Sequence, residues 1–122
     1  MIYLCGPIFG RSDDECRDWR DVVKAALPHC IDPTRRDFRG LEESEYEAIV
    51  EGDLDDIDRA DSLLVYFDRP SVGTAMEVFY GYRSGKRVVV VNASGGALSP
   101  WLRYHCHEVV SDLETAIRVL RK

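Results

Sequence analysis

The chain has 122 residues, a length that suits one domain with a hydrophobic core rather than two. Hydrophobic residues make up 45% of it and charged residues 31%, as in ordinary globular proteins. Sixteen basic against 22 acidic residues give a net charge of −6, which argues against DNA or another nucleic acid polymer as the main ligand. A small phosphate compound stays possible. We therefore expect residues 1–122 to form a single domain.

The sequence shows no sign of membrane insertion or secretion. No apolar run approaches the roughly 20 residues that cross a membrane. The start, MIYLCGPIF, lacks the basic region of a signal peptide and leads directly into a strand-like run. The cysteines show no CxxC spacing, and their neighbours indicate reduced, buried thiols at Cys5 and Cys30. We expect a cytoplasmic protein without membrane contact.

Strands and helices alternate from the first residue. The apolar run MIYLC is the first predicted strand, and the dipeptide GP stops it. Ser12 and Glu15 have the spacing of a capping box, so a helix begins there. Its predicted inner face consists of Trp19, Val22, Val23, Ala26 and Leu27. HCID (29–32) is the second strand, and PTRRDFRG (33–40) is an arginine-rich loop.

The middle of the chain predicts two further helices and two further strands. Residues 42–60 carry apolar side chains near helical spacing, at Tyr46, Ile49, Val50, Leu54, Ile57 and Ala60. SLLVYF (62–67) is continuously apolar, which is typical of a central parallel strand covered on both faces. A helix over 73–84 ends at Gly85, and RVVVVN (87–92) is the fourth strand.

The last segments complete a β-α repeat. Ser99 caps a short helix that begins with proline, and HEVV (107–110) is a fifth, edge strand. Ser111 caps the final helix, whose inner face is Leu113, Ala116, Ile117 and Leu120. This alternation implies an α/β fold, a parallel sheet with helices on both faces. For a strand order 2-1-3-4-5, ligands bind beyond the carboxyl ends of the first and third strands.

Glu77 is the candidate catalytic residue beside that point. No Lys or Arg lies three or four residues away, so no helical ion pair explains it. We expect it in the first turn of its helix, where the dipole favours the ionised form, whereas burial favours the neutral form. A partly desolvated carboxylate in a cleft can act as a nucleophile, as in retaining glycosidases. The alternative is an acid that only suits the helix dipole.

Other polar residues give weaker signals. Asp53 is a candidate general acid, and Gly52 would let it approach a ligand. The aspartates around it fit a solvated helix face better than a metal site. Tyr3 can hydrogen-bond Glu77 or serve as a core aromatic. HCH (105–107) could suggest a metal, and because adjacent strand residues point to opposite faces, only His105 and His107 could share it. We predict no metal and no cofactor.

Three loops are candidates for substrate contact. GPIFGR (6–11) and PSVGT (70–74) follow strands and lead to helix N-termini, where backbone N–H groups suit phosphate or ribose hydroxyls. Neither has a dinucleotide or Walker spacing. DPTRRDFRG (32–40) suits a planar base, or is a charged surface loop. The expected contacts are Gly6, Pro7, Phe9, Arg11, Arg36, Asp37, Phe38, Ser71, Gly73 and Thr74.

Five segments together resemble the nucleoside 2-deoxyribosyltransferase family over nearly the whole chain. They are IYLCGPIF (2–9), DPTRRDFRG (32–40), GDLDDIDRADSLLVYF (52–67), GTAMEVFYGYRSGKRVVVV (73–91) and SPWLRYH (99–105). The resemblance implies a flavodoxin-like, doubly wound sheet of five parallel strands in the order 2-1-3-4-5. It implies sugar exchange on a nucleoside or nucleotide, with Glu77 as nucleophile, Tyr3 orienting it and Asp53 protonating the leaving base. It also implies a homodimer or larger homo-oligomer in which the Ser99 region reaches a neighbouring active site.

One position departs from the transferases. Six residues before the nucleophile they typically carry an Asp that holds the sugar's 5′ side, and Ser71 stands there in this chain. A serine resembles the related nucleoside 5′-monophosphate N-glycosidases, because a hydroxyl donates to a phosphate that Asp would repel. Pro7 and Phe9 differ from the Ser and Arg of one hydrolase subgroup, and Arg11 can compensate. Transfer to a base, transfer to water, and a non-catalytic nucleotide-binding module all stay open.

Overall fold

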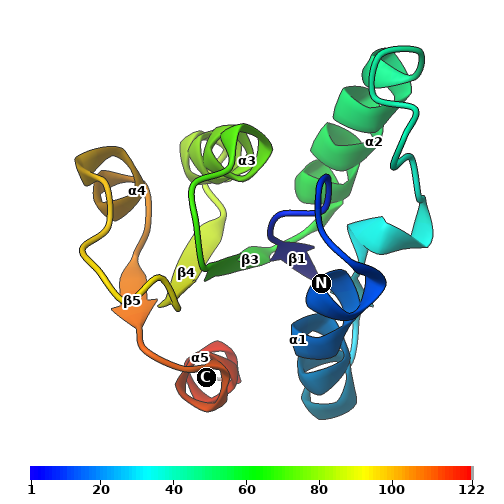
Figure 1. Cartoon of the computed structure of the whole chain (residues 1–122). Helices are drawn as coiled ribbons and strands as arrows, with labels where there is room; N and C mark the ends of the chain where they lie inside the picture. Colours follow the sequence, from blue (N-terminus) through cyan, green and yellow to red (C-terminus); the bar gives the residue numbers. More distant parts are fainter. Residues whose placement is uncertain (122) are drawn as a thin grey trace.

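The structure, a computed structural model, describes residues 1–121. Five parallel strands form one sheet in the order β2-β1-β3-β4-β5 (Figure 1). The strands are β1 (Ile2–Cys5), β2 (Cys30–Ile31), β3 (Ser62–Phe67), β4 (Arg87–Asn92) and β5 (Glu108–Val110). The predicted α/β, flavodoxin-like sheet and its strand order are confirmed. β1 and β3 therefore lie side by side at the centre, with the helices that follow them on opposite faces.

The helices cover both faces of the sheet. They are α1 (Asp13–Ala26), α2 (Tyr46–Arg59), α3 (Val72–Arg83), α4 (Pro100–Tyr104) and α5 (Leu113–Leu120), with a short 3₁₀ helix η1 (Pro33–Arg35). Figure 1 shows α2, α3 and α4 on one face and α1 and α5 on the other. Among residues 1–121, no helix has the length and apolar character needed to cross a membrane.

The period-2 alternation of β1 divides its residues between two hydrophobic cores. Tyr3 and Cys5 join the core on the face of α2, α3 and α4. Leu4 points the other way, into the core that contains Trp19 of α1. Tyr3 and Cys5 thus share the face on which α3 lies.

Close packing fixes the position of α3 on the sheet. A Cβ atom on Gly81 would lie 2.8 Å from Cδ2 of Leu63, far inside van der Waals contact. The glycine therefore lets α3 lie directly on β3. Its effect as a small residue is to bring the helix close to the sheet, not to admit a ligand.

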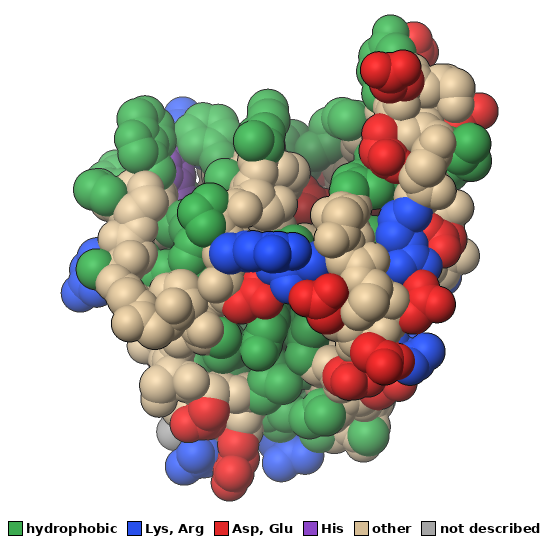
Figure 2. Space-filling model, in the orientation of Figure 1, with side chains coloured by type: hydrophobic (Ala, Val, Ile, Leu, Met, Phe, Trp, Pro, Cys, Tyr) green, Lys and Arg blue, Asp and Glu red, His purple; other side chains and the backbone are tan. Residues whose placement is uncertain are grey.

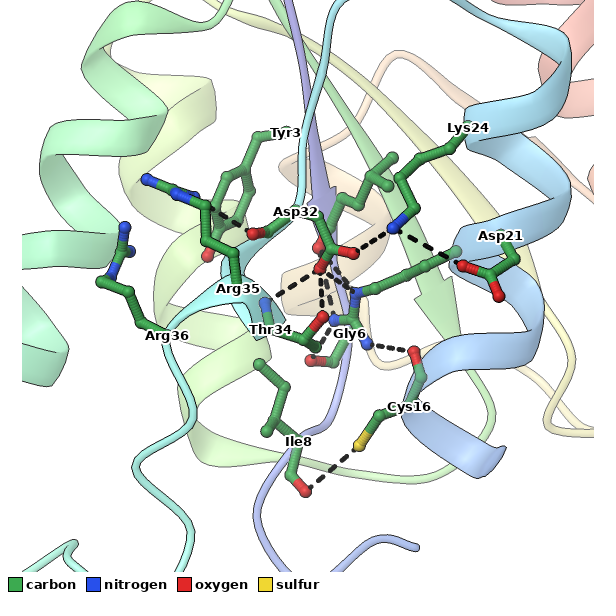
Figure 3. A network of polar contacts seen from close by, with 12 residues as sticks. Tyr3, Gly6, Ile8, Cys16, Asp21, Lys24, Asp32, Thr34, Arg35 and Arg36 are labelled. Carbon is green, nitrogen blue, oxygen red and sulfur yellow. Dashed lines mark hydrogen bonds and ion pairs between the residues drawn. The ribbon is translucent and has the colours of Figure 1, made fainter. Parts of the chain in front are cut away.

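A buried arginine anchors the end of β1. Arg20 of α1 is fully buried and donates to the main-chain carbonyls of Leu4, Gly6 and Cys16. Its guanidinium lies 4.4 Å from the ring centroid of Trp19. Figure 3 shows the surrounding polar network between α1, β1 and η1. The backbone from which the GPIFGR loop departs is held by hydrogen bonds that sequence patterns do not reveal.

Two details of the helices differ from the predictions. The capping box of Ser12 and Glu15 is present, but Val22 is 52% exposed rather than on the inner face of α1. Arg20 lies on the buried face of α1 instead, because its guanidinium donates hydrogen bonds to three main-chain carbonyls there. The cap of α5 is Asp112, which accepts from a backbone N–H of the first turn, and not Ser111. A carboxylate one position later satisfies the same helix N-terminus.

Candidate active site

The Glu77 carboxyl group faces β1. The hydroxyl of Tyr3 donates a hydrogen bond to Glu77 Oε2. The thiol of Cys5 lies 3.6 Å from Oε1 of the same carboxyl. The predicted contact between Tyr3 and Glu77 is therefore present.

The position of Glu77 in α3 was predicted incorrectly. Ser71 caps the helix and Val72 begins it, so Glu77 is its sixth residue and lies in the second turn. The free N–H groups belong to the first turn, and the dipole effect falls off beyond it. The helix N-terminus therefore does not account for this carboxylate.

Burial dominates the titration of Glu77. Burial and then the nearby Asp53 carboxylate raise the pKa of Glu77 to about 8, although hydrogen bonds from Tyr3 and Cys5 act in the opposite direction. Burial also raises the pKa of Tyr3, with the Glu77 charge as the next cause. The phenol consequently keeps its proton and donates. Of the two opposing effects considered from the sequence, burial outweighs the dipole.

Asp53 supplies a second carboxyl group from α2. Its side chain is 26% exposed, and an oxygen lies 3.4 Å from a guanidinium nitrogen of Arg36. Burial raises the pKa of Asp53, with the Arg36 charge opposing it. Gly52 faces this guanidinium, because a Cβ atom there would lie 3.1 Å from Nε of Arg36. The glycine makes room for the arginine side chain, and the approach of Asp53 to a ligand stays a prediction.

A cavity of about 630 Å³ lies over these groups, a size typical of small-molecule sites. The loop after β1 and residues of α2, α3 and α4 form its walls. The predicted site residues in these walls are Gly6, Pro7, Phe9, Asp53, Ser71, Gly73, Thr74 and Glu77. Tyr3, only 1% exposed, lies behind Glu77. Within residues 1–121, no Lys or Arg lines this cavity.

Several predicted contacts lie elsewhere. Arg11 binds both oxygens of Asp68, at 2.8 and 2.5 Å, and its side chain is 6% exposed. Ser99 caps α4 by accepting from the Trp101 N–H. The residues expected to touch substrate that the structure does not bring into the cavity wall are Arg11, Arg36, Asp37, Phe38 and Ser99.

The arginine-rich loop packs against α2 and contributes no residue to the wall of the cavity over Glu77. Asp56 of α2 is buried, and Arg35, Arg36 and Arg59 all donate to its carboxylate at 2.6–2.9 Å. Burial alone would raise the pKa of Asp56, but these ion pairs lower it to about 2. Asp37 pairs with Arg39 of its own loop. Arg35 and Arg36 of the loop predicted to bind a planar base thus belong to a structural ion-pair cluster.

A comparison with known protein families identifies the family of this chain. The sequence model described as "Nucleoside 2-deoxyribosyltransferase like" matches residues 1–94. The chain belongs to this family. The match includes β1, α2 and α3, which carry Tyr3, Asp53 and Glu77, and ends before α4.

Two solved structures share the family's fold. The 2-deoxyribosyltransferase of Bacillus psychrosaccharolyticus superposes with a TM-score of 0.78 at 23% identity, over 95% of this chain and 89% of that one. The Clostridium botulinum CMP N-glycosidase BcmB superposes with a TM-score of 0.64 at 13% identity, over all of both chains. No curated protein sequence matches significantly. At these identities the likeness establishes the fold.

One residue of the site, Cys5, was not predicted, and one predicted residue, Thr74, has an unexpected environment. Cys5 contacts Glu77, and its position two residues after Tyr3 on a strand was the available signal. The Thr74 hydroxyl oxygen is buried and lacks a hydrogen-bond partner among residues 1–121. This hydroxyl is therefore an unsatisfied polar group of the described chain.

The histidines of HCH do not converge on a common point. His105 contacts the Trp101 carbonyl through Nδ1, at 2.7 Å. His107 accepts from the Val88 N–H through its own Nδ1, at 3.0 Å. In the described part of the chain, no group of three His, Cys, Asp or Glu residues is placed to hold a metal ion.

Proposed function

We propose that the protein cleaves the N-glycosidic bond of a deoxynucleoside and transfers the sugar, through a glycosyl ester on Glu77, to another base. The supporting observation is the half-buried Glu77 carboxyl in the cavity wall, held by Tyr3 and close enough to Asp53 for their charges to interact. A displacement that retains configuration uses two carboxyl groups, one as nucleophile and one as acid.

The reaction follows from these roles. Ionised Glu77 attacks C1′ of the sugar from below, and the C1′–N bond breaks with its electrons passing to the base. Asp53 or a water molecule gives the base its proton. An incoming base, or water, then attacks C1′ and breaks the ester, which restores the carboxylate and the original configuration. Tyr3 keeps the attacking carboxylate in one orientation throughout.

The two carboxyl groups must share protons in the right order. The higher pKa of Glu77 places a proton on it at pH 7, whereas attack needs that proton to be absent. Two interacting acids titrate as a pair. The form with one proton becomes reactive when the proton resides on Asp53. A positively charged sugar above Glu77 favours this distribution, because it stabilises the nearer carboxylate.

Charge supports an unphosphorylated substrate. The acidic groups Asp53 and Glu77 line the cavity, and the described wall contains no Lys or Arg. Arg11, the nearest candidate from the sequence, is bound to Asp68 and Glu15. A phosphate dianion would meet two carboxyl groups and no free cation, so a neutral nucleoside fits better.

Hydrolysis of a nucleoside 5′-monophosphate is the second candidate. The Ser71 side chain caps α3, and the partnerless Thr74 hydroxyl lies in the same turn. Helix N-termini bind phosphates through backbone N–H groups. The Ser71 hydroxyl and this helix N-terminus support a phosphate subsite even without an arginine.

We further propose that the active protein is a homo-oligomer. Large apolar side chains of α3 and α4 are exposed beside the cavity, a surface we call the α3–α4 face: Val72, Met76, Phe79, Trp101 and Tyr104. Figure 2 shows hydrophobic side chains gathered over these two helices. Exposed apolar patches of this kind mark interaction sites. A second copy on the α3–α4 face would close the open side of the cavity, and the expectation of shared active sites rests on this surface.

One incubation tests the function. The protein is mixed with a deoxynucleoside, its 5′-monophosphate and a different free base, and the products are separated by chromatography. A new nucleoside supports transfer, whereas free base with free sugar or sugar phosphate supports hydrolysis. If neither substrate changes, the proposal is wrong and a nucleotide-binding module is the better description.

A further inference from the structure

Glu77 has a second neighbour on β1 besides Tyr3. Cys5 is completely buried, and its Sγ lies 3.6 Å from Glu77 Oε1, within hydrogen-bond range for sulfur. The Tyr3 hydroxyl already serves Oε2. Each carboxyl oxygen therefore faces one donor from the same strand.

The thiol acts as a donor in this contact. Burial, and then the Glu77 charge, raise the pKa of Cys5, so the sulfur keeps its proton. The other acceptor within reach is the Thr74 carbonyl, at 4.0 Å. That distance is longer, and the carbonyl belongs to the hydrogen-bond ladder of α3. The carboxyl oxygen is the better partner.

We propose that Cys5 is a positioning residue that sets the basicity of the Glu77 nucleophile, an inference that rests on the proposed function. A thiol is a weak donor compared with a hydroxyl. It therefore keeps Oε1 in place without strongly stabilising the carboxylate. Oε1 remains more basic than Oε2 and is the oxygen suited to attack C1′.

Few other groups act on this carboxyl. Tyr3 and Cys5 face it from β1, Asp53 from α2, and the charge of buried Arg20 from α1. Asp53 disfavours the ionised form, and the other three favour it. A change at Cys5 thus alters one of a small number of influences, and its effect is measurable.

Substitutions of opposite hydrogen-bonding character test the role. Cys5→Ala removes the donor, and Cys5→Ser replaces it with a stronger one of smaller size. The measurement is the pH dependence of kcat/KM for base release from a deoxynucleoside. We expect the basic limb, which reports the higher pKa of the pair and therefore Glu77, to move up by about 0.5 pH unit in Cys5→Ala and down by a similar amount in Cys5→Ser. Cys30→Ser, at a half-buried thiol that contacts Leu27, is the matched control and leaves the limb unchanged.

The outcomes separate this role from packing and from the function itself. If Cys5 acts only in packing, both variants have a lower kcat/KM, but the limbs of their pH profiles lie at the same pH. If both variants are active and their pH profiles stay in place or shift in the same direction, the role of Cys5 is wrong and the proposed function stands. A wild-type protein that releases no base from any deoxynucleoside overturns the function and the role together. The infrared S–H band of Cys5 gives a readout without activity, because it shifts in Glu77→Ala if the contact exists and stays unchanged if it does not.

Discussion

Tyr3 and Glu77 lie 74 positions apart in the chain, and the Tyr3 hydroxyl donates a hydrogen bond to the Glu77 carboxyl. The parallel pairing of β1 with β3 makes this contact possible, since α3 follows β3, packs on β3 and β4, and also contacts the neighbouring β1. The pair joins the first strand to the third crossover helix. Its place beyond the central strands is where sheets of this type bind ligands.

Replacing the nucleophile should abolish the reaction and leave the fold intact. We expect Glu77→Gln to lower base release by at least about a thousandfold, because a neutral amide cannot form the ester. The raised pKa of Glu77 means that wild-type stability falls as pH rises from about 5 through 8, where the buried acid must ionise. The variant should thus match wild type in urea unfolding at pH 5 and exceed it at pH 9. Wild-type turnover by Glu77→Gln would refute the mechanism.

Removing the phenol hydroxyl should shift the pH profile. The hydrogen bond from Tyr3 lowers the pKa of Glu77, so Tyr3→Phe raises it further. Because Glu77 has the higher pKa of the two interacting carboxyl groups, the basic limb of kcat/KM should move to higher pH, by about one unit. Rates at pH 7 and at pH 9 show this directly. A profile with lower activity but the wild-type limb would mean that Tyr3 acts only in packing.

The sequence predicted the fold more completely than the site. Alternating elements and the unbroken run SLLVYF determine a doubly wound sheet, because each strand must be covered on both faces. The loop DPTRRDFRG shows the limit of this approach. Its arginines reach a buried aspartate on α2, and no local pattern reports that pairing. Contacts between loops and distant helices depend on tertiary packing.

Asp56 should contribute to stability rather than to chemistry. Its buried carboxylate binds three arginines, and its folded pKa of about 2 lies below the ordinary value. Asp56→Asn should lower the free energy of unfolding at pH 7 by about 2 kcal/mol. The stabilisation exists above about pH 4 and disappears as pH falls towards 2, so the difference between the two proteins should shrink over that interval. Urea denaturation at several pH values measures it, and a constant difference would contradict the ion-pair account.

The side chain at position 71 should control the response to phosphate. Asp caps helices as well as Ser does, so Ser71→Asp should keep α3 folded while adding a negative charge. We expect the ratio of kcat/KM for a 5′-monophosphate to that for its nucleoside to fall about tenfold or more. Ser71→Asn, which caps without charge, is the control. If wild type and both variants have the same ratio, the proposed phosphate subsite is wrong.

Oligomerisation should depend on the α3–α4 face. Trp101 is 73% exposed, and Trp101→Glu places a charge on that surface. We expect analytical ultracentrifugation to show a dimer or larger species for wild type and a monomer of reduced activity for the variant. Val22→Glu, at an exposed apolar residue of α1 on the other face, should change neither property. A monomeric wild type would show that this surface has another use.

The site itself could be predicted in part. Glu77 and Tyr3 follow from strand and helix positions together with the resemblance, and the structure brings them into contact. The ionisation of Glu77 could not be predicted, because it depends on how deeply the carboxyl is buried. Thr74 was among the expected substrate contacts, but the missing partner of its hydroxyl and the contact of Cys5 with Glu77 depend on tertiary packing.

The proposed chemistry also depends on Gly81, a residue that does not line the cavity. Since its missing side chain lets α3 lie against Leu63, it sets the height of that helix above the sheet. Even an alanine there would lift the carboxylate of Glu77 away from the tyrosine beneath it. The position of the Glu77 carboxylate thus depends on a glycine one helical turn further along α3, where even a methyl side chain would not fit.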